Sequence, residues 1–347
     1  MKKSLNSKNH SRRSPFSAAA SIILAALLVC AALLPGCAGT GHQGKIRLLA
    51  TVFPFYDWAR EVAKDVDNVE ISLLVGNGAD IHSYVPGVAD VAAISTCDII
   101  VYAGGESDAW VKDALKNVPA GGNKPVEVTV SEVPGVTLLA EEIKEGMQEP
   151  AEEHDRGDGD HAHGDGEGFD EHLWLSFENA KAAVKAIASA LSGKDPENAG
   201  KYTGNAEKYC SSLDSLKESY AAAVKAADTK VLFFGDRFPF LYLTREFGLD
   251  YYAPFVGCSA ETEVSPSTIV FLKEKAAELG VSKVIVLPGS SRKIADTVMS
   301  ETAHARDYTL LTLDPMQQTP AKDAGANTYI SVMEANLRVL SDALSKS

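Results

Sequence analysis

The sequence predicts an α/β protein with two similar lobes, each built on a mostly parallel four-stranded sheet, joined by one long rigid helix. Short, fully apolar segments alternate with helical patterns in both halves of the chain, which is typical of parallel strands covered by helices on both faces. Between the halves, from Phe177 to about Asp228, no strand signal occurs and the apolar spacing is helical. The total of 347 residues is enough for two full hydrophobic cores.

The first half of the chain reads as alternating strands and helices. Its predicted strands cover residues 45–52, 69–75, 98–104 and 136–139, and its predicted helices cover 53–64, 88–95 and 107–115. Pro54 falls in the first turn of the first helix, where a backbone N–H is not needed. The second strand is followed by a loop, residues 76–86, that is rich in residues that break helices and strands and carries His82.

A long helix is expected between the two halves. A first helix over residues 181–191 is followed by Pro196, which starts a second helix that continues to about residue 228. A helix of ~30 residues would be ~45 Å long and would act as a stiff strut between two lobes.

The second half repeats the order of the first. Its predicted strands cover residues 230–235, 250–255, 283–287 and 308–313, and its predicted helices cover 266–279, 291–303 and 329–344. The motif Phe-Pro-Phe occurs at 53–55 and at 238–240, each time at the first strand-to-helix turn of its half and each time followed by Arg-Glu in the same register. The expected organisation is a signal peptide (1–36), a tether (37–45), an N-terminal lobe (46–195) that includes a His- and acid-rich loop (141–171), a linking helix (196–228) and a C-terminal lobe (229–347).

The N-terminus has the features of a secretory signal. A segment with several Lys and Arg residues precedes an apolar run at 18–34, which has signal-peptide length and is short for a membrane span. The following Leu-Pro-Gly-Cys sequence, ending at Cys37, resembles a bacterial lipobox, in which the cysteine is lipidated and becomes the first mature residue. A cleaved signal with an incidental cysteine is the alternative. We expect an extracytoplasmic protein, lipid-anchored to the bacterial cell membrane through Cys37.

The charge balance limits the ligand class. The net charge is −14 for the whole chain and −19 for residues 37–347, where 28 basic side chains stand against 47 acidic ones. Such a body repels nucleic acid and anionic lipid, and its field favours cations. No nucleic-acid partner is therefore expected.

Four of the eight histidines lie between residues 152 and 175, among many Asp and Glu side chains. Glycines in this segment argue against a stable helix or a packed strand. Imidazoles and carboxylates suit a zinc-like ion, so the loop histidines, His154, His161 and His163, are expected to collect metal. A solvated acidic linker is the alternative. His172 directly precedes the apolar Leu173–Leu175 and is expected at the edge of the folded body.

Polar residues follow several predicted strands, at the edge where ligands bind in open parallel sheets. His82 follows the second strand, and His172 follows the loop after the fourth. The corresponding polar residues of the second half are Asp236, Arg237, Cys258, Glu261, Glu263 and Asp314. Because one lobe offers histidines and the other mainly carboxylates, we expect a divalent metal to be held between the lobes.

Five cysteines are present, of which Cys30 lies in the signal and Cys37 takes the lipid. The remaining three leave at least one thiol free or metal-bound in an oxidising compartment. Cys97 precedes an apolar strand and is expected in the core. A disulfide between Cys210 and Cys258 remains open as a structural alternative.

Four motifs carry a family resemblance: Gly-Ala-Asp-Ile-His-Ser-Tyr-Val-Pro at 78–86, Asp-Ile-Ile-Val-Tyr-Ala-Gly-Gly at 98–105, Asp-Glu-His-Leu-Trp-Leu at 170–175 and Thr-Leu-Asp-Pro-Met at 312–316. Together they resemble the zinc/manganese solute-binding lipoproteins of metal ABC importers, the cluster A-I class. The resemblance covers nearly all of the mature chain. It implies two lobes joined by one rigid helix, a metal buried between them, and delivery to a membrane permease and its ATPase. By match, His82 and His172 are the ligands of the N-terminal lobe, and Asp314 is the carboxylate of the other.

The third ligand of this family is altered. Zinc members have a histidine, and manganese members a glutamate, at the position that falls here on Arg237, whose guanidinium cannot coordinate a cation. Either Asp236 takes its place with a shift of one residue, or one of Glu261, Glu263 and Cys258 reaches in. Arg237 would in the second case pair with one of these acids. The usual carboxylate pair after the second histidine is also replaced, by Leu-Ser-Phe at 175–177.

The expected function is capture of Zn²⁺ for import by a monomeric binding protein that is not an enzyme, and the first alternative is Mn²⁺. Two histidines and a His-rich loop favour zinc, since Mn²⁺ prefers more oxygen donors. A metal-dependent hydrolase is a second alternative, against which no His-Glu-x-x-His helix is found. A surface adhesin or a metal buffer is the third.

Overall fold

The computed structural model describes residues 44–76, 78–118, 123–148, 168–259, 263–324 and 326–346. The chain divides into two compact units, Met1–Gly44 and Lys45–Ser347, and the second unit contains the fold described below. Several predicted features lie outside the described residues: the signal peptide, the lipidated Cys37, the loop histidines His154, His161 and His163, and Glu261. Within the described ranges, no helix has both the length and the apolar character needed to cross a membrane.

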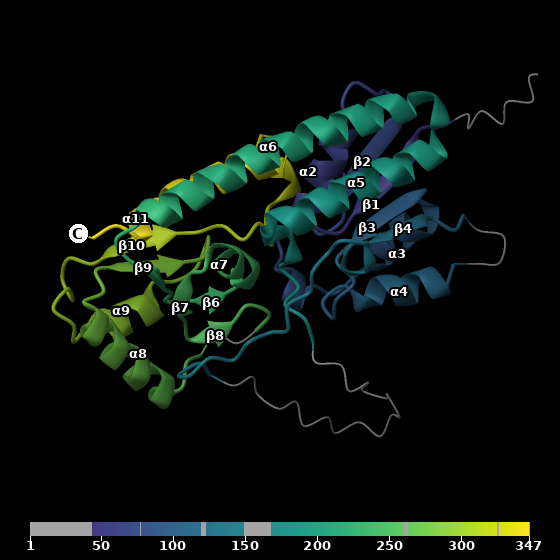
Figure 1. Ribbon diagram of the computed structural model, residues 1–347. Helices are drawn as coiled ribbons and strands as arrows, with labels where there is room; N and C mark the ends of the chain where they lie inside the picture. The colour runs from purple at the N-terminus through teal and green to yellow at the C-terminus, as the bar shows by residue number, and fades with distance from the viewer. Residues whose placement is uncertain are drawn as a thin grey trace, which may run out of the picture. The chain divides into compact units, whose positions relative to one another are not determined.

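The N-terminal lobe is built on a parallel four-stranded sheet (Figure 1). Its strands are β1 (Ile46–Ala50), β2 (Val69–Leu73), β3 (Ile99–Tyr102) and β4 (Val126–Thr129), in the order β2-β1-β3-β4. The two central strands are almost entirely buried, which explains why they read as continuous apolar segments in the sequence.

The strand predicted at 136–139 is wrong, because the fourth strand is β4 (Val126–Thr129). Val126 and Glu127 lie at an exposed edge of the sheet, so β4 lacks the apolar character of its neighbours. The apolar run 136–139 is held by single hydrogen bonds from side chains and backbone, and not by a strand. The Asn179 side chain accepts a hydrogen bond from the backbone N–H of Thr137 (2.8 Å) and donates one to its carbonyl (3.0 Å).

Helices cover both faces of this sheet. Leu48 and Ala50 point to the face covered by α2 (Phe53–Val62) and α5 (Phe177–Lys194). The alternate residue, Leu49, belongs to a separate core that contains residues of α3 (Val88–Thr96) and α4 (Ala109–Lys116). This alternation is the period of two that places successive strand side chains on opposite faces.

The C-terminal lobe contains three parallel strand pairs. β5 (Val231–Phe233) pairs with β7 (Asp250–Tyr252), β9 (Lys283–Val286) pairs with β10 (Thr309–Thr312), and β6 (Arg237–Phe238) pairs with β8 (Phe255–Val256). A parallel bridge between Phe234 and Ile285 connects the first pair to the second, which gives the spatial order β7-β5-β9-β10. The two lobes therefore share the same parallel α/β design.

Helices also cover both faces of the second sheet. On one side, α8 (Pro266–Leu279) and α9 (Lys293–Met299) enclose a core that includes Phe233 and Val284. On the other side, α7 (Leu241–Phe247) and α11 (Tyr329–Ala343) pack against the larger core that continues into the first lobe. The short α10 (Ala321–Ala324) precedes α11. The helix predicted at 291–303 is shorter than expected, because α9 ends at Met299.

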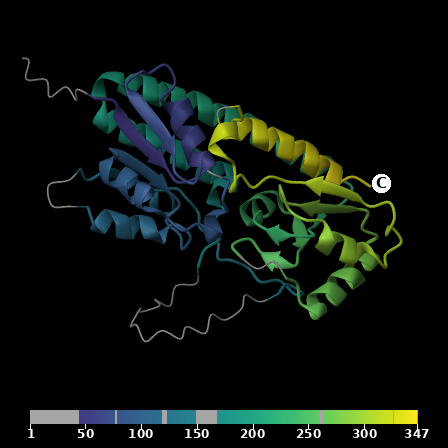
Figure 2. The ribbon, with the colours of Figure 1, turned by 180° about the vertical axis from the view of Figure 1, so that it is seen from behind.

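The predicted long helix is confirmed as α6 (Ala199–Ala226), whose 28 residues extend ~42 Å. It contacts α2 and α5 of the first lobe and α11 and α7 of the second. Figures 1 and 2 show from opposite sides that α6 extends from the first sheet to the second. The Tyr220 hydroxyl donates a hydrogen bond of 2.6 Å to the Met333 carbonyl in α11. One hydrophobic core, with members such as Leu48, Tyr220 and Ile285, runs from the first sheet past α6 to the second sheet.

Candidate metal centre

His82 lies in η1 (Ile81–Ser83), a short 3₁₀ helix in the loop after β2. Asp80 caps this turn by accepting a hydrogen bond from the His82 backbone N–H at 3.1 Å. The His82 Nδ1 atom lies 2.8 Å from the Ser107 hydroxyl and 3.4 Å from Glu171 Oε2. The side chain is only 3% exposed, so its ring is fixed by contacts on the Nδ1 side while Nε2 points into the site.

His172 precedes η3 (Leu173–Leu175) and is fully buried. Asp170 Oδ1 accepts a hydrogen bond from the His172 backbone N–H (2.9 Å) and lies 3.0 Å from Nδ1. Burial opposes protonation of this imidazole, but the Asp170 carboxylate and the Gln317 side chain outweigh it and raise the pKa of His172 in the absence of metal. A carboxylate behind Nδ1 fixes the tautomer and leaves Nε2 as the metal-binding atom.

The two predicted histidines meet. The Nε2 atoms of His82 and His172 are 3.1 Å apart, and their ring centroids are 4.9 Å apart. Two imidazole nitrogens bound to one tetrahedral zinc at 2.0–2.1 Å would be ~3.3 Å apart. The observed spacing is therefore close to that of a pair of ligands sharing one ion.

Cys258 is the third side chain of this group. Its Sγ atom and the ligand nitrogens of His82 and His172 all lie within 4.8 Å of one another. The residue follows β8, and its backbone N–H donates a hydrogen bond of 3.1 Å to Glu141 Oε1. Burial raises the pKa of the Cys258 thiol well above its ordinary value. All three described cysteines are free, so the disulfide between Cys210 and Cys258 does not form.

Gln317 faces the same group and was not predicted from the sequence. Its Oε1 atom is 2.8 Å from Nε2 of His172, and its Nε2 atom donates to Asp80 Oδ2 at 3.1 Å. Gln317 is only 3% exposed, and a polar side chain is rarely buried to this degree unless it is hydrogen-bonded, as this one is to His172 and Asp80. The available signal was its position three residues after Asp314, inside a segment that otherwise matches the family.

The Arg237 side chain forms an ion pair and a hydrogen bond near the histidine group. Its guanidinium pairs with Asp80 Oδ2 and donates a further hydrogen bond of 3.0 Å to the Ser259 carbonyl. Although burial disfavours the charged form, the Arg237 guanidinium holds the pKa of Asp80 below its ordinary value. Among the described residues, the acid paired with Arg237 is therefore Asp80 of the first lobe, two residues before His82.

Of the predicted carboxylates of the second lobe, the three that the structure describes, Asp236, Glu263 and Asp314, do not join the histidine group. Asp314 Oδ1 accepts a hydrogen bond from the Met316 backbone N–H at 2.8 Å, and burial raises the pKa of Asp314. Both oxygens of Asp236 accept backbone hydrogen bonds, from Arg237 (2.8 Å) and from Leu287 (3.1 Å). Glu263 is exposed just before α8. Among the described residues, Cys258 is thus the C-terminal-lobe candidate that lies with the two histidines.

A turn between β3 and α4 supports the histidines from behind. The Ser107 backbone N–H donates to Glu171 Oε1 at 2.8 Å, while the Ser107 hydroxyl contacts His82. Burial opposes ionisation of Glu171, but its contacts with His82 and Ser107 hold the pKa of this carboxyl below its ordinary value. A Cβ atom at Gly105 would lie 2.1 Å from Glu171 Oε1, so glycine is needed for this approach. Neither Glu171 nor Ser107 was predicted.

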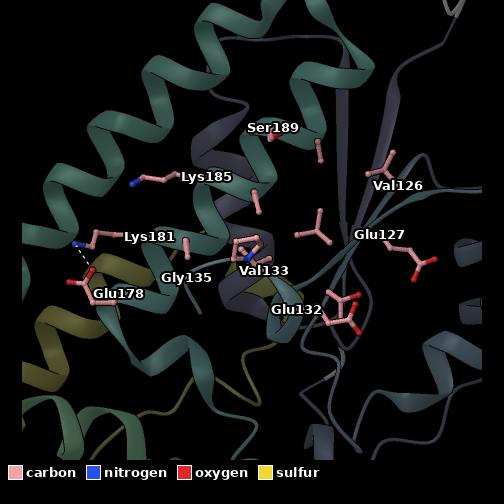
Figure 3. Close-up of a pocket in the computed structure, with 15 residues that line it drawn as sticks. Val126, Glu127, Glu132, Val133, Gly135, Glu178, Lys181, Lys185 and Ser189 are labelled. Carbon is pink, nitrogen blue, oxygen red and sulfur yellow. Dashed lines mark ion pairs between the residues drawn. The ribbon is translucent and has the colours of Figure 1, made fainter. Parts of the chain in front are cut away.

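A cavity of ≈ 320 Å³ borders the site at His82, and its lining also includes Asp80 and Arg237. A larger groove of ≈ 1000 Å³ lies between β4 and α5, where Figure 3 shows Lys181 turned toward Glu178. The residues that line this groove include no histidine and no cysteine. The groove is therefore separate from the candidate metal chemistry.

Two parallel α/β lobes on one long helix, with an imidazole pair buried at their junction, define the class of metal-binding solute-binding proteins. The family model described as "ZnuA: Zinc-uptake complex component A periplasmic" matches residues 48–343, and the chain belongs to this family. It is 32% identical over 323 residues to the zinc-binding lipoprotein AdcA of Streptococcus pneumoniae R6, covering 92% of this chain and 60% of AdcA. It is 30% identical over 325 residues to the high-affinity zinc uptake system protein ZnuA of Bacillus subtilis 168, covering 92% and 96% of the two chains.

Solved structures show the same fold. The Zn(II)-bound ZnuA-like domain of Streptococcus pneumoniae AdcA aligns with a TM-score of 0.66 and 27% identity, covering 87% of this chain and all (100%) of that domain. This chain spans about 60% of the length of full AdcA, so it corresponds to one part of that relative. The predicted family and fold are both confirmed.

Proposed function

We propose that this protein is the extracytoplasmic solute-binding component of an ABC importer, which captures Zn²⁺ between its lobes and delivers it to a membrane permease driven by an ATPase. The family match and the zinc-binding relatives support this proposal. Zinc is the metal that these relatives carry in their names, so the manganese, hydrolase and adhesin alternatives are not favoured.

The observation that carries the proposal is the close approach of two buried imidazoles. His82 and His172 have Nε2 atoms 3.1 Å apart. Each ring has an oxygen partner at Nδ1, namely Ser107 for His82 and Asp170 for His172. Because Nδ1 of each ring faces an oxygen partner, the two Nε2 atoms are the ones left to bind a shared cation between the rings.

Nitrogen donors at this spacing suit zinc, which prefers four ligands in a tetrahedral arrangement. Both imidazoles must be unprotonated to bind, so protons compete with the metal and affinity falls in acid. For His172, whose pKa is raised in the absence of metal, binding of Zn²⁺ displaces a proton that is held more tightly than usual.

Anchoring and metal collection are further parts of the proposal. A lipid on Cys37 would anchor the protein to the membrane, near the permease. We expect the anchored protein to be a monomer. The loop histidines His154, His161 and His163 would raise the local zinc concentration and pass ions to the buried pair. Deletion of residues 152–167 tests the loop, and unchanged zinc uptake at scarce metal would exclude this role.

The central experiment measures zinc affinity by competition with a chelator, using protein that lacks residues 152–167 so that loop binding does not interfere. We expect His82→Ala and His172→Ala each to weaken Zn²⁺ binding by about 100-fold or more, since even outer partners of ligands are worth 10–100-fold. His304→Ala is the matched control, because His304 lies far along the chain and contacts Asp307 at 3.3 Å. Wild-type affinity in the His82/His172 double variant would refute the proposal.

A further inference from the structure

We infer that Cys258 supplies a thiolate ligand from the second lobe, which makes this site selective for thiophilic divalent ions such as Zn²⁺ over Mn²⁺. The inference rests on the proposed capture of metal by His82 and His172. It adds Cys258 as the ligand that connects the ion to the second lobe, and this ligand determines which ions the site binds.

The geometry brings sulfur and nitrogen donors to one point. The Cys258 Sγ atom lies within 4.8 Å of the ligand nitrogens of both histidines. In a tetrahedral zinc site with Zn–S of 2.3 Å and Zn–N of 2.0–2.1 Å, sulfur and nitrogen are ~3.6 Å apart. A movement of up to ~1.2 Å, the difference between 4.8 Å and ~3.6 Å, would therefore complete an N₂S set around one ion.

The backbone around Cys258 is built for this approach. A Cβ atom at Gly257 would lie 2.8 Å from the Phe238 carbonyl oxygen and 3.2 Å from His172 Cε1. Only a residue without a side chain lets the strand end run so close to the imidazole. Glu141, from a segment of the first half, accepts a hydrogen bond of 3.1 Å from the Cys258 backbone N–H and thereby fixes the position of Cys258.

The other candidates of the second lobe have different partners. Arg237 pairs with Asp80, and the Asp236 oxygens accept backbone hydrogen bonds. Asp314 accepts from the Met316 N–H and does not belong to the histidine group. The Gln317 side-chain oxygen lies 2.8 Å from His172 Nε2, so a fourth position on the ion, next to this oxygen, would be left for a water molecule.

Thiolate ligation determines the metal class. Soft sulfur ligands select zinc and similar ions, whereas Mn²⁺ is better served by carboxylate and water oxygens. On binding, the Sγ–H bond breaks, the sulfur lone pair forms the bond to the metal, and the proton leaves to the buffer. One proton more is therefore released per zinc than by a site without the thiol.

The other two described cysteines serve as matched controls. The Cys97 thiol donates to the Ile94 carbonyl at 3.2 Å inside a separate core. Cys210 lies on α6, with its sulfur 3.9 Å from the Lys181 carbonyl. Neither belongs to the histidine group.

Co²⁺ is the probe for the test, because a cobalt–thiolate bond gives an intense sulfur-to-metal charge-transfer absorption in the near ultraviolet. We expect this band in protein lacking residues 152–167, its loss in Cys258→Ser, and its retention in Cys97→Ser and Cys210→Ser. Cys258→Ser should also weaken Zn²⁺ binding by about 10–100-fold or more, while Mn²⁺ binding changes little. The ratio of the Zn²⁺ affinity to the Mn²⁺ affinity should therefore fall by the same factor.

The outcomes separate this inference from the proposed function. Stoichiometric Co²⁺ binding that depends on His82 and His172 but lacks the band in the wild-type protein would overturn the role of Cys258 and leave zinc capture intact. No binding of Co²⁺ or Zn²⁺ would overturn both. As a second measurement on unaltered protein, Zn²⁺ should slow alkylation of Cys258 at least about 10-fold, and an equal rate with and without zinc contradicts ligation.

Discussion

Removal of the Asp80 carboxylate should weaken the contact between the two lobes. Asp80 lies in the first lobe, two residues before His82, and its Oδ2 atom takes three donors from the second lobe. These are the guanidinium of Arg237, the Gln317 amide at 3.1 Å and the Gln318 amide at 2.8 Å. One carboxylate thus joins three side chains across the lobe junction, in the metal-free protein.

The size of the effect follows from burial. The Arg237 and Asp80 side chains are 15% and 13% exposed, so the pair is largely shielded from water. Removal of one partner of a buried ion pair costs ~3–5 kcal/mol, because the other charge is left unpaired. Arg237 keeps its hydrogen bond to the Ser259 carbonyl, and we therefore expect about 2–3 kcal/mol for Asp80→Ala. Arg237→Ala should cost less, since two amides still satisfy Asp80.

A double-mutant cycle isolates the pair. Urea unfolding of Asp80→Ala, Arg237→Ala and the double variant, in the presence of a chelator, should give a coupling free energy of about 1–2 kcal/mol. The control is the exposed pair Arg292–Asp296, whose side chains are 60% and 49% exposed and whose coupling should be about 0.5 kcal/mol or less. Equal coupling in the two cycles would refute the view that Asp80 holds the lobes together.

Further predictions concern the pH dependence of stability through Asp57 and the effect of adding a side chain at Gly257 or Gly204. Burial raises the pKa of Asp57 to about 6, so the folded state holds this proton more tightly than the unfolded state and stability falls as pH rises. The free energy of unfolding of the wild-type protein should fall by about 2 kcal/mol through Asp57 between about pH 4.5 and 7.5. Asp57→Asn keeps an acceptor for the Tyr329 N–H and should lack this pH dependence. Parallel pH profiles of the unfolding free energy in the two proteins would contradict this prediction. Gly257→Ala should displace Cys258 and remove the cobalt–thiolate band, because its Cβ would lie 2.8 Å from a carbonyl oxygen. Gly204→Ala in α6, with nothing within 4 Å of its Cβ, should instead stabilise the protein by about 0.5–1 kcal/mol and leave the band unchanged.

The fold was predictable from local patterns because its central strands are buried on both faces and its linking helix is long. Residues 99–102 and 283–286 are almost wholly apolar, and each follows a helical segment, which is sufficient to predict a parallel sheet. β4 was missed for the opposite reason. Its first two residues are exposed at the sheet edge, and an edge strand lacks the apolar pattern that marks the interior ones.

The imidazole pair was predictable from position, whereas its partners across the junction were not. His82 and His172 both follow predicted elements of the first lobe, and a sheet-edge argument brings them together. Contacts between lobes depend on how two separate sheets are placed against α6, which no local pattern specifies. For this reason Gln317 was not predicted, and Cys258 remained one of several alternatives.

Charge explains why the second lobe can dispense with a histidine at position 237. An arginine there brings a positive charge toward a cation site, but Asp80 neutralises it at close range. The carboxylates of Asp170 and Glu171 lie behind the two imidazoles, at 3.0 Å and 3.4 Å from their Nδ1 atoms. If Cys258 binds as a thiolate, as we propose, three negative charges would lie around a divalent ion whose nitrogen ligands are neutral. Under this proposal the site would still attract Zn²⁺, and its preference for zinc would come from the Cys258 sulfur instead of from a histidine at position 237.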